Sequence, residues 1–577
     1  MSPTAGVLAV LTVTVVTLGI GAVGLRLSRT TSDFYVASRA VSPRWNASAI
    51  GGEYLSAASF LGVAGLVLAG GVDMLWFPVG YTAGYLVLLV LVAAPLRRSG
   101  AYTLPDFAEQ RLESRAVRQV SSVLVVGIGV LYLLPQFQGA GLALRAVTGA
   151  PAWAGAALVA GTVVLNVLAG GMRSITFVQA FQYWLKLTAI ALPLAFLLLA
   201  WHTDGAPSPL GDELPVARET TTVTLPAETE VRADRSTRLV VDGRRVSLAA
   251  EEELTLDAGT VVTVPEGQVV PHASRLVATT GDEWSLPLVG SGREHPLYAT
   301  YSLILALFFG TMGLPHVLVR FYTNPDGAAA RRTTLVVIGL LGAFYLFPPL
   351  YGALGRLYAS DLLLTGRTDA VVLALPGRML PDPWGDLLGA LVVAGAFAAF
   401  LSTSSGLVVS VAGVLSQDLL PASASLSGHR FRVRSVRGFR IAAVLAVVVP
   451  FLLSLASSRV GLADTVGLAF ALAASTFCPL LVLGIWWRGL TARGAVAGLA
   501  TGGALASAAV TTTMLAGPLD GWPGALLAQP AAWTVPAAFA VMVGASLATR
   551  GAVPADVGRT MVRLHAPERA RPPVERT

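Results

Sequence analysis

Residues 50–62 read Ile50–Gly51–Gly52–Glu53–Tyr54–Leu55–Ser56–Ala57–Ala58–Ser59–Phe60–Leu61–Gly62 and lie in the middle of an apolar run from about Trp45 to Gly71. Two adjacent glycines weaken a helix, and a carboxylate such as Glu53 is costly in hydrocarbon unless it faces a protein interior or a water-filled cavity. A helix broken at mid-membrane frees carbonyls that can hold a cation, and its half-helix N-terminus attracts an anion. The alternative is a small-residue surface for close helix packing. We interpret the stretch as a broken helix, with non-helical backbone near Gly51–Glu53.

The composition is that of a polytopic membrane protein. Of the 577 residues, 54% are hydrophobic and 13% are charged, and the mean hydropathy is +0.68; soluble globular domains have about 25% charged residues. The single cysteine, Cys478, excludes an intramolecular disulfide and a cysteine metal cluster. Thirteen apolar runs are long enough to cross a bilayer, which takes about 20 residues. They lie near 4–25, 45–71, 74–96, 118–143, 152–170, 174–201, 297–321, 333–355, 385–414, 439–457, 462–486, 494–516 and 531–549.

The arginines predict the orientation of these spans. If the N-terminus is outside, the inner loops and the tail carry 26 arginines and the short outer loops carry five. An excess of basic residues marks the cytoplasmic side. The sequence therefore predicts a multi-pass plasma membrane protein with its N-terminus outside and its C-terminus in the cytoplasm, and it gives no reason to expect nucleic acid as a partner.

Residues 205–295 interrupt the pattern of apolar spans. They are polar, with alternating runs at 221–225, 239–241 and 261–264 and turn pairs at Asp242–Gly243 and Glu266–Gly267, a pattern typical of strands and hairpins. We expect a small extracellular β-rich insertion; a disordered loop is the alternative. The predicted domains are residues 1–204 with spans one to six (first core repeat from about 45), the insertion 205–295, residues 296–549 with spans seven to thirteen (second repeat to about 487), and a cytoplasmic tail, 550–577, which we expect to be disordered from Gly551.

A second polar stretch lies inside the ninth span, at Gly395–Gly406. Ala399, Ser402 and Thr403 share one helix face because they are spaced i, i+3 and i+4. Two hydroxyls and a few carbonyls suit a singly charged cation such as Na⁺, whereas a divalent ion would favour carboxylates. Taken alone, the stretch is more typical of a Ser- and Thr-rich packing helix than of a cation site.

A third stretch, Gly310–Phe321, ends the seventh span. Two glycines and Pro315 interrupt its apolar helix, so the second and seventh spans are both interrupted, five spans apart. This is the pattern of two inverted five-helix repeats with a binding site near the bilayer midplane. His316 and Arg320 are four residues apart and are expected to form a structural or gating anchor, since no nucleophile and acid complete a catalytic triad.

Together these residues carry a family resemblance. Gly313–Phe321 is similar to the signature of the sodium:solute symporter family, and Ala399–Thr403 resembles its cation-site motif. Further similar positions are Asp33–Tyr35 with Arg39, and Gly170–Met172 with Thr176 and Gln179. Glu53–Gly62 and Tyr132–Gln136 most resemble the cation/acetate and monocarboxylate branch, which usually has an aspartate in place of Glu53. The resemblance covers roughly residues 30–490 and implies the five-plus-five inverted-repeat transporter fold, all-α apart from the insertion.

The resemblance also implies binding residues. The cation Na⁺ would be held by the carbonyls of Gly52, Leu55 and Ala399 and by the hydroxyls of Ser402 and Thr403. The solute is expected beside the helix break, where a half-helix N-terminus favours a carboxylate. Candidate solute contacts, each also readable as packing, are Tyr54, Ser56, Tyr132, Gln136, Phe309 and Thr311.

Lys186, the only lysine, lies inside the sixth span. It could balance Glu53 or attract an anion, but we expect its long side chain to extend to an interface.

The leading hypothesis is a secondary transporter that couples Na⁺ entry to uptake of a short monocarboxylate such as acetate, pyruvate or propionate. The alternatives are an amino acid or sugar as solute, H⁺ in place of Na⁺, and a sensor built on a transporter fold, for which a roughly 28-residue tail is too short to form a signalling domain. An enzyme is not expected, because the sequence lacks paired catalytic carboxylates, a nucleotide loop and a metal-spaced histidine cluster. No cofactor is expected beyond the coupling ion.

Overall fold

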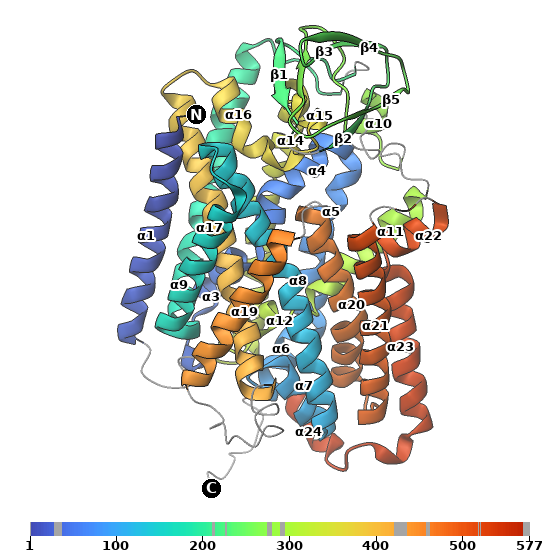
Figure 1. The fold of residues 1–577 in the computed structure, drawn as a ribbon. Coiled ribbons are helices and arrows are strands. Elements are labelled where there is room, and N and C mark those ends of the chain that lie inside the picture. Colours follow the sequence, from blue (N-terminus) through green and yellow to red (C-terminus); the bar gives the residue numbers. More distant parts are fainter. Residues whose placement is uncertain are drawn as a thin grey trace.

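A computed structural model describes residues 2–27, 37–210, 214–225, 228–273, 280–288, 295–419, 436–456, 462–516, 519 and 521–568. Long helices run side by side in a bundle, and the strands lie at one end of it (Figure 1). The start of the chain lies at the same end of the bundle (Figure 1). It is held there by a hydrogen bond, in which the backbone amide of Ser2 donates to Asp386 Oδ1 at 2.5 Å. The helix α24 lies at the other end (Figure 1).

The first half of the bundle contains the long helices of the N-terminal part of the chain and several shorter segments between them. In order they are α1 (Pro3–Leu27), η1 (Ala37–Arg39), α3 (Pro43–Tyr54), η2 (Ala58–Gly62), α4 (Val63–Gly70), η3 (Gly71–Leu75), α5 (Trp76–Val87), η4 (Leu88–Val92), α6 (Ala93–Ser99), α7 (Leu104–Leu112), α8 (Arg115–Thr148) and α9 (Ala152–Thr203). The range of α9 spans a kink at Gly171, whose φ of 58° is left-handed.

The second half follows the strands and continues to the C-terminal helix. In order they are α10 (Gly281–Ser285), α11 (Pro296–Thr311), α12 (Pro315–Phe321), α13 (Gly327–Tyr345), α14 (Pro348–Tyr358), α15 (Asp361–Leu364), η5 (Thr368–Ala370), α16 (Val371–Met379), α17 (Trp384–Val414), η6 (Leu415–Leu419), α19 (Val436–Ala456), α20 (Leu462–Trp486), α21 (Ala492–Ala516), α22 (Gly521–Ala528), α23 (Ala531–Ala548), η7 (Arg550–Ala552) and α24 (Val557–His565).

Within the described ranges, eleven helical runs are long and apolar enough to cross a membrane. The difference from the thirteen predicted spans has two causes. Residues 58–99 count as one apolar run of 42 residues, although the backbone turns at Gly71 (φ 63°, ψ −142°) between α4 and α5; the run therefore contains the predicted span 74–96 and the second half of the span 45–71. The other cause is the fifth predicted span, 152–170, of which Ala152–Leu168 is a shorter apolar helix.

The second and seventh predicted spans are both broken. The second span consists of α3, the π-helical turn η2 and α4, and the helix is interrupted at Leu55–Ser56. The seventh consists of α11 and α12, separated at Met312–Leu314, where Leu314 is extended (φ −74°, ψ 115°) and precedes Pro315. A residue before proline avoids helical backbone, so the proline fixes where α12 begins. The predicted interruption of both spans is confirmed.

Strands form in the predicted insertion. A four-stranded sheet has the order β1 (Thr221–Thr224), β6 (Val261–Val264), β3 (Thr237–Val241) and β4 (Arg244–Leu248), and β2 (Thr229–Arg232) pairs with β5 (Glu253–Leu256). All pairs are antiparallel. Asp242 and Gly243 both have positive φ values, of 47° and 79°, as a tight hairpin turn requires. Val231, Leu239, Val262 and Leu364 of α15 share the insertion's apolar core.

The prediction of a disordered tail from Gly551 is wrong for its first part, which forms η7 and α24. Met561 and Leu564 on one face of α24 are buried, and Arg98 Nη1 donates to His565 O at 3.0 Å. The amphipathic spacing of these residues explains the docking. Most of residues 415–438, which connect the ninth and tenth predicted spans, and Asp33–Tyr35 lie outside the described residues.

Candidate functional site

The break in the second span lies one turn later than predicted. Residues 51–54 are helical, and the backbone departs from the helix at Leu55 (φ −73°, ψ 87°) and Ser56. The glycines instead allow close packing, because a Cβ on Gly52 would lie 2.1 Å from the carbonyl oxygen of Gln179 on α9. Both readings of the stretch therefore hold: the helix is broken, and its small residues pack closely. The break releases the carbonyls of Gly52 and Leu55 from helix bonding.

The polar stretch of α17 lies against this break. Thr403 Oγ1 donates to Glu53 O at 2.6 Å, and Ser402 Oγ donates to Ala399 O at 3.1 Å. Both hydroxyl residues are fully buried. The structure therefore brings the five predicted cation ligands into two adjacent groups on α3 and α17. Their oxygens are all neutral, and such a set fits a monovalent cation.

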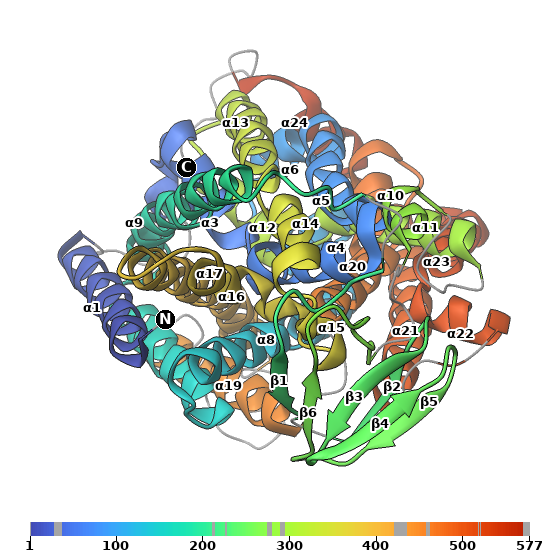
Figure 2. The same cartoon turned by 90° about the horizontal axis from the view of Figure 1, so that it is seen from above.

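One face of α9 closes the site. Thr176, Gln179 and Lys186 follow a helical spacing of three and seven residues, so they lie on one side. Gln179 Nε2 donates to Ser402 O at 2.7 Å. The three helices α3, α9 and α17 pack against one another and lie together when the bundle is viewed end-on (Figure 2).

Lys186 does not extend to an interface as expected, and it is fully buried. Its Nζ donates to Gly52 O, to Leu55 O at 2.7 Å and to Ser402 Oγ at 3.0 Å. All three acceptors belong to the predicted cation site. The spacing along the sixth span did not reveal this, because an isolated charge on an apolar helix gives no indication of which neighbour it faces.

Glu53 forms its ion pair with Arg320 and not with Lys186. Arg320 Nε donates to Glu53 Oε2 at 2.6 Å, and both side chains are 1% exposed. Arg320 Nη1 also donates to Thr176 Oγ1 at 2.8 Å, and Nη2 donates to Gln179 Oε1. Arg320 thus ties α12 to α3 and α9, which agrees with its predicted role as a structural anchor.

Aromatic side chains gather beside the break. Tyr54 Oη is 3.0 Å from Thr311 Oγ1 and donates to Tyr81 O at 3.1 Å. The Tyr54 ring meets the Tyr85 ring at 4.9 Å and the Phe470 ring at 6.2 Å between centroids. Tyr54 and Thr311, two predicted solute contacts from different spans, are therefore direct neighbours.

The remaining predicted solute contacts have different surroundings. Tyr132 stacks on His316 with centroids 5.1 Å apart and lies beside Ser56. Gln136 Oε1 accepts from Ala57 N at 3.1 Å, so this side chain caps the broken helix. Phe309 is partly buried and packs both against the small cluster that contains Ala471 and Val535 and against the main core.

Sequence reasoning missed three members of this group: Tyr81, Tyr85 and Phe470. The Tyr81 and Tyr85 hydroxyls, and both ring nitrogens of His316, are buried and have no hydrogen-bond partner among the described residues. Buried hydroxyls normally have partners. The spacing of Tyr81 and Tyr85, one helical turn apart beside Gly80 and Gly84, is the signal that could have found them.

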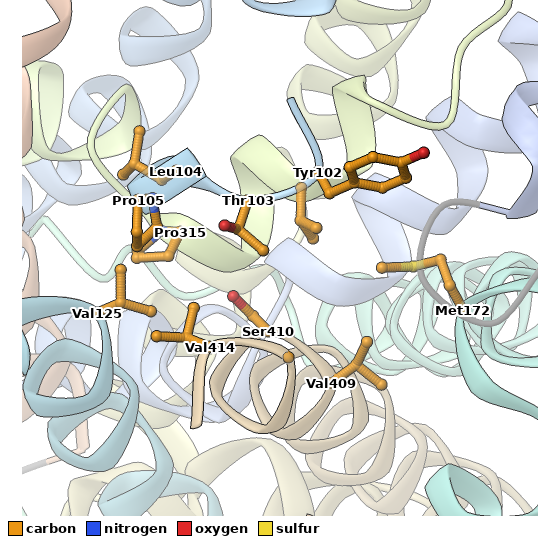
Figure 3. A pocket seen from close by; sticks show the side chains of 12 residues that line it. Tyr102, Thr103, Leu104, Pro105, Val125, Met172, Pro315, Val409, Ser410 and Val414 are labelled. Atoms are coloured by element: carbon orange, nitrogen blue, oxygen red, sulfur yellow. The ribbon is translucent and has the colours of Figure 1, made fainter. Parts of the chain in front are cut away.

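A pocket lies farther along α17, between this site and the end of the bundle that carries α24. It holds about 360 Å³ of empty space, part of it open to solvent, and lies among α7, α8, α12 and α17. Figure 3 shows the hydroxyls of Thr103 and Ser410 pointing into it. Ser410 is seven residues beyond Thr403, roughly 10 Å along the helix. None of the predicted solute contacts lines this pocket.

The chain is similar to known transporters. The family model for the sodium:solute symporter family matches residues 34–206 and 284–502. An uncharacterised symporter of Bacillus subtilis, YwcA, is 29% identical over 90% of this chain and 89% of its own length. A monocarboxylic acid transporter of Corynebacterium glutamicum is 29% identical over 83% of this chain and 78% of its own length.

Among solved structures, a Na⁺-coupled sialic acid symporter in a substrate-bound, outward-open state superposes with a TM-score of 0.59 at 12% identity. The match covers 93% of this chain and 98% of that chain. The likeness concerns the fold, which is the predicted five-plus-five transporter fold. The family match spans more than half of the chain and leaves out most of the β-rich insertion. The protein is a membrane transporter, not an enzyme, and belongs to the sodium:solute symporter family.

Proposed function

We propose that the chain is a secondary active symporter that takes up a short monocarboxylate, such as acetate, pyruvate or propionate, driven by a cation gradient. The observation that carries the proposal is that freed carbonyls at the end of α3 and a hydroxyl of α17 converge on one point, the Nζ atom of Lys186. The aromatic group around Tyr54 beside the break holds buried polar groups with no hydrogen-bond partner among the described residues. A cation and an anion can thus be held next to each other, which is what coupling requires.

Sodium is the coupling ion that the family implies. The proposed ligands are the carbonyl oxygens of Gly52, Leu55 and Ala399 and the hydroxyls of Ser402 and Thr403. For the solute, the proposed contacts are Tyr54, Ser56, Tyr132 and Thr311, extended by Tyr81, Tyr85 and His316. Hydroxyl and imidazole donors are suited to a carboxylate. The named substrate class of the Corynebacterium glutamicum relative supports a monocarboxylate.

Buried charges add to this preference for an anion. Lys186 and Arg320 contribute two positive charges and Glu53 one negative charge, all buried around the break. The attraction between opposite charges is strong in a medium of low dielectric constant. A carboxylate entering beside this group meets an excess positive charge.

Alternating access is the proposed mechanism. The solute site lies where both broken spans meet, and the pocket around Ser410 extends from α17 toward the end that carries α24. Movement of α12 and α17 relative to α7 and α8 would connect the proposed solute site with the pocket around Ser410. We propose that this end is cytoplasmic, that the β-rich insertion is extracellular and that the protein resides in the plasma membrane.

Uptake into proteoliposomes tests the proposal. Labelled acetate, pyruvate and proline are offered separately with an inward Na⁺ gradient, with an inward H⁺ gradient and with neither. The proposal expects acetate or pyruvate to enter faster with a cation gradient than without one. Uptake of proline alone would indicate that the substrate is an amino acid. Uptake of none of the three compounds would contradict the proposed function.

A further inference from the structure

We propose that the ammonium group of Lys186 and Na⁺ are mutually exclusive occupants of one site, so that Lys186 acts as a tethered cation. The inference rests on the proposed cation site between α3 and α17. It adds a property of this chain: the site is filled by the protein's own side chain whenever Na⁺ is not bound.

The contacts of the ammonium carry the inference. A lysine ammonium has three N–H donors and no acceptor. In the structure these three donors have three acceptors, Gly52 O, Leu55 O at 2.7 Å and Ser402 Oγ at 3.0 Å. Each acceptor is a proposed Na⁺ ligand, and Lys186 has no exposed surface.

A purely structural ion pair does not account for this position. A lysine that served only to neutralise Glu53 would lie on the carboxylate. Arg320 bonds Glu53 Oε2 at 2.6 Å, but the other carboxylate oxygen, Oε1, has no hydrogen-bond partner among the described residues. Lys186 instead lies on neutral oxygens, as a metal cation would.

The choice of residue type points the same way. Lys186 is the only lysine among 40 basic residues, and the other 39 are arginines. A guanidinium is a broad planar group, whereas an ammonium is a compact point charge. The chain therefore uses its one compact cationic side chain at the place where a small monovalent cation is expected.

Two physical effects make the occupants exclusive. Sodium needs the lone pairs that the ammonium already uses, and two like charges in contact repel strongly in a buried site. Sodium binding therefore requires the flexible Lys186 stem to withdraw. When Na⁺ leaves, the returning ammonium keeps the freed carbonyls of α3 from remaining buried without a partner, which would cost free energy.

The test measures Na⁺ binding directly, with no solute present. The purified full-length chain, Lys186→Ala and Lys186→Arg are titrated with ²²Na⁺ in detergent, with choline chloride holding ionic strength constant. Breaking even one hydrogen bond of a charged group corresponds to about a tenfold change in an equilibrium constant. Lys186→Ala should therefore bind Na⁺ at least about tenfold more tightly than the native chain, while Lys186→Arg, which keeps the charge, should show no such gain.

Two further variants keep the test decisive. Adding Thr403→Ala to Lys186→Ala should reverse most of the gain, which locates the bound ion at this site. If Lys186→Ala does not fold, Lys186→Met keeps the length of the stem, removes the charge and should show the same direction of change. Sodium binding no tighter than that of the native chain in the folded neutral variants would overturn the inference.

This result is separable from the proposed function. Tighter Na⁺ binding by Lys186→Ala together with no uptake of acetate, pyruvate or proline would refute the proposed function and leave the tethered cation standing. Monocarboxylate uptake by the native chain, together with unchanged Na⁺ binding in the neutral variants, would support the proposed function and refute the tethered cation.

Discussion

At the scale of single residues, Thr403 joins the ninth span to the broken second span through its hydroxyl, which donates to Glu53 O. The hydroxyl oxygen keeps lone pairs for a cation. Thr403→Ala should raise the Na⁺ concentration that gives half-maximal uptake by about 5- to 150-fold, since a lost contact of roughly 1–3 kcal/mol corresponds to that range. Thr403→Ser keeps the hydroxyl and serves as the control. An alanine variant with the native Na⁺ dependence would remove Thr403 from the site.

Tyr85 offers a cleaner test of solute binding, because its buried hydroxyl has no partner among the described residues. Tyr85→Phe removes no hydrogen bond of the protein and should leave the thermal unfolding midpoint unchanged. It should raise the solute concentration for half-maximal uptake by about 10- to 150-fold, the equivalent of roughly 1.5–3 kcal/mol for a hydrogen bond to a charged group.

The matched control for Tyr85 is Tyr54→Phe, because the Tyr54 hydroxyl is bonded to Thr311 and Tyr81. This variant should lose stability by about 0.5–1.5 kcal/mol as well as affinity. Native solute affinity in Tyr85→Phe would show that its hydroxyl does not contact the solute.

The residues of the site differed in how far the sequence could predict them. The helical spacing of Ser402 and Thr403 predicted that they share one face, and the family resemblance implied the carbonyls of Gly52 and Leu55 as further ligands. Lys186, Tyr81 and Phe470 come from other spans, and which neighbour they face depends on the rotation of each helix about its axis. Aromatic residues in apolar spans are also common as packing, so the missing hydroxyl partners became visible only in three dimensions.

At the scale of helices, the buried pair Glu53–Arg320 holds three of them together. Removing one member of a buried pair leaves an uncompensated charge and costs roughly 3–5 kcal/mol. Glu53→Gln and Arg320→Met should each lower the midpoint of thermal unfolding in detergent. The double variant should lose less than the sum of the two single variants, since the residues are in direct contact. Additive losses would mean that the ion pair does not couple α3 and α12.

Most elements were predictable because each apolar run has the length of a span. The break in the second span was predicted one turn too early, because the glycines that weaken the helix were read as the break itself. Their closer role is to let α9 approach, as the 2.1 Å separation between a Cβ on Gly52 and Gln179 O requires. The α24 helix was missed because proline and arginine dominate the composition of the tail. Only two apolar residues of the helix, Met561 and Leu564, are buried, and two such residues give a weak periodic signal.

At the scale of the whole molecule, the strands and the start of the chain lie at one end of the bundle and α24 lies at the other (Figure 1). The arginine distribution predicts that the strands face outward. A cysteine at exposed Ser247 of β4 should react with an impermeant thiol reagent on intact cells. A cysteine at exposed Ala555 should react only after permeabilisation. Native Cys478 is buried and contributes little background. The opposite pattern would reverse the orientation.

The claim that a cation gradient drives solute uptake concerns the whole transport cycle, and concentrative uptake tests it most directly. Proteoliposomes holding the purified chain are loaded with a known acetate concentration, and the same concentration of labelled acetate is present outside. On imposing an inward cation gradient, the internal acetate concentration should rise above the external one, and it should return to equality when an ionophore dissipates the gradient. An internal concentration that stays equal to the external one under every cation gradient, while label still exchanges, would show a facilitator and contradict the account.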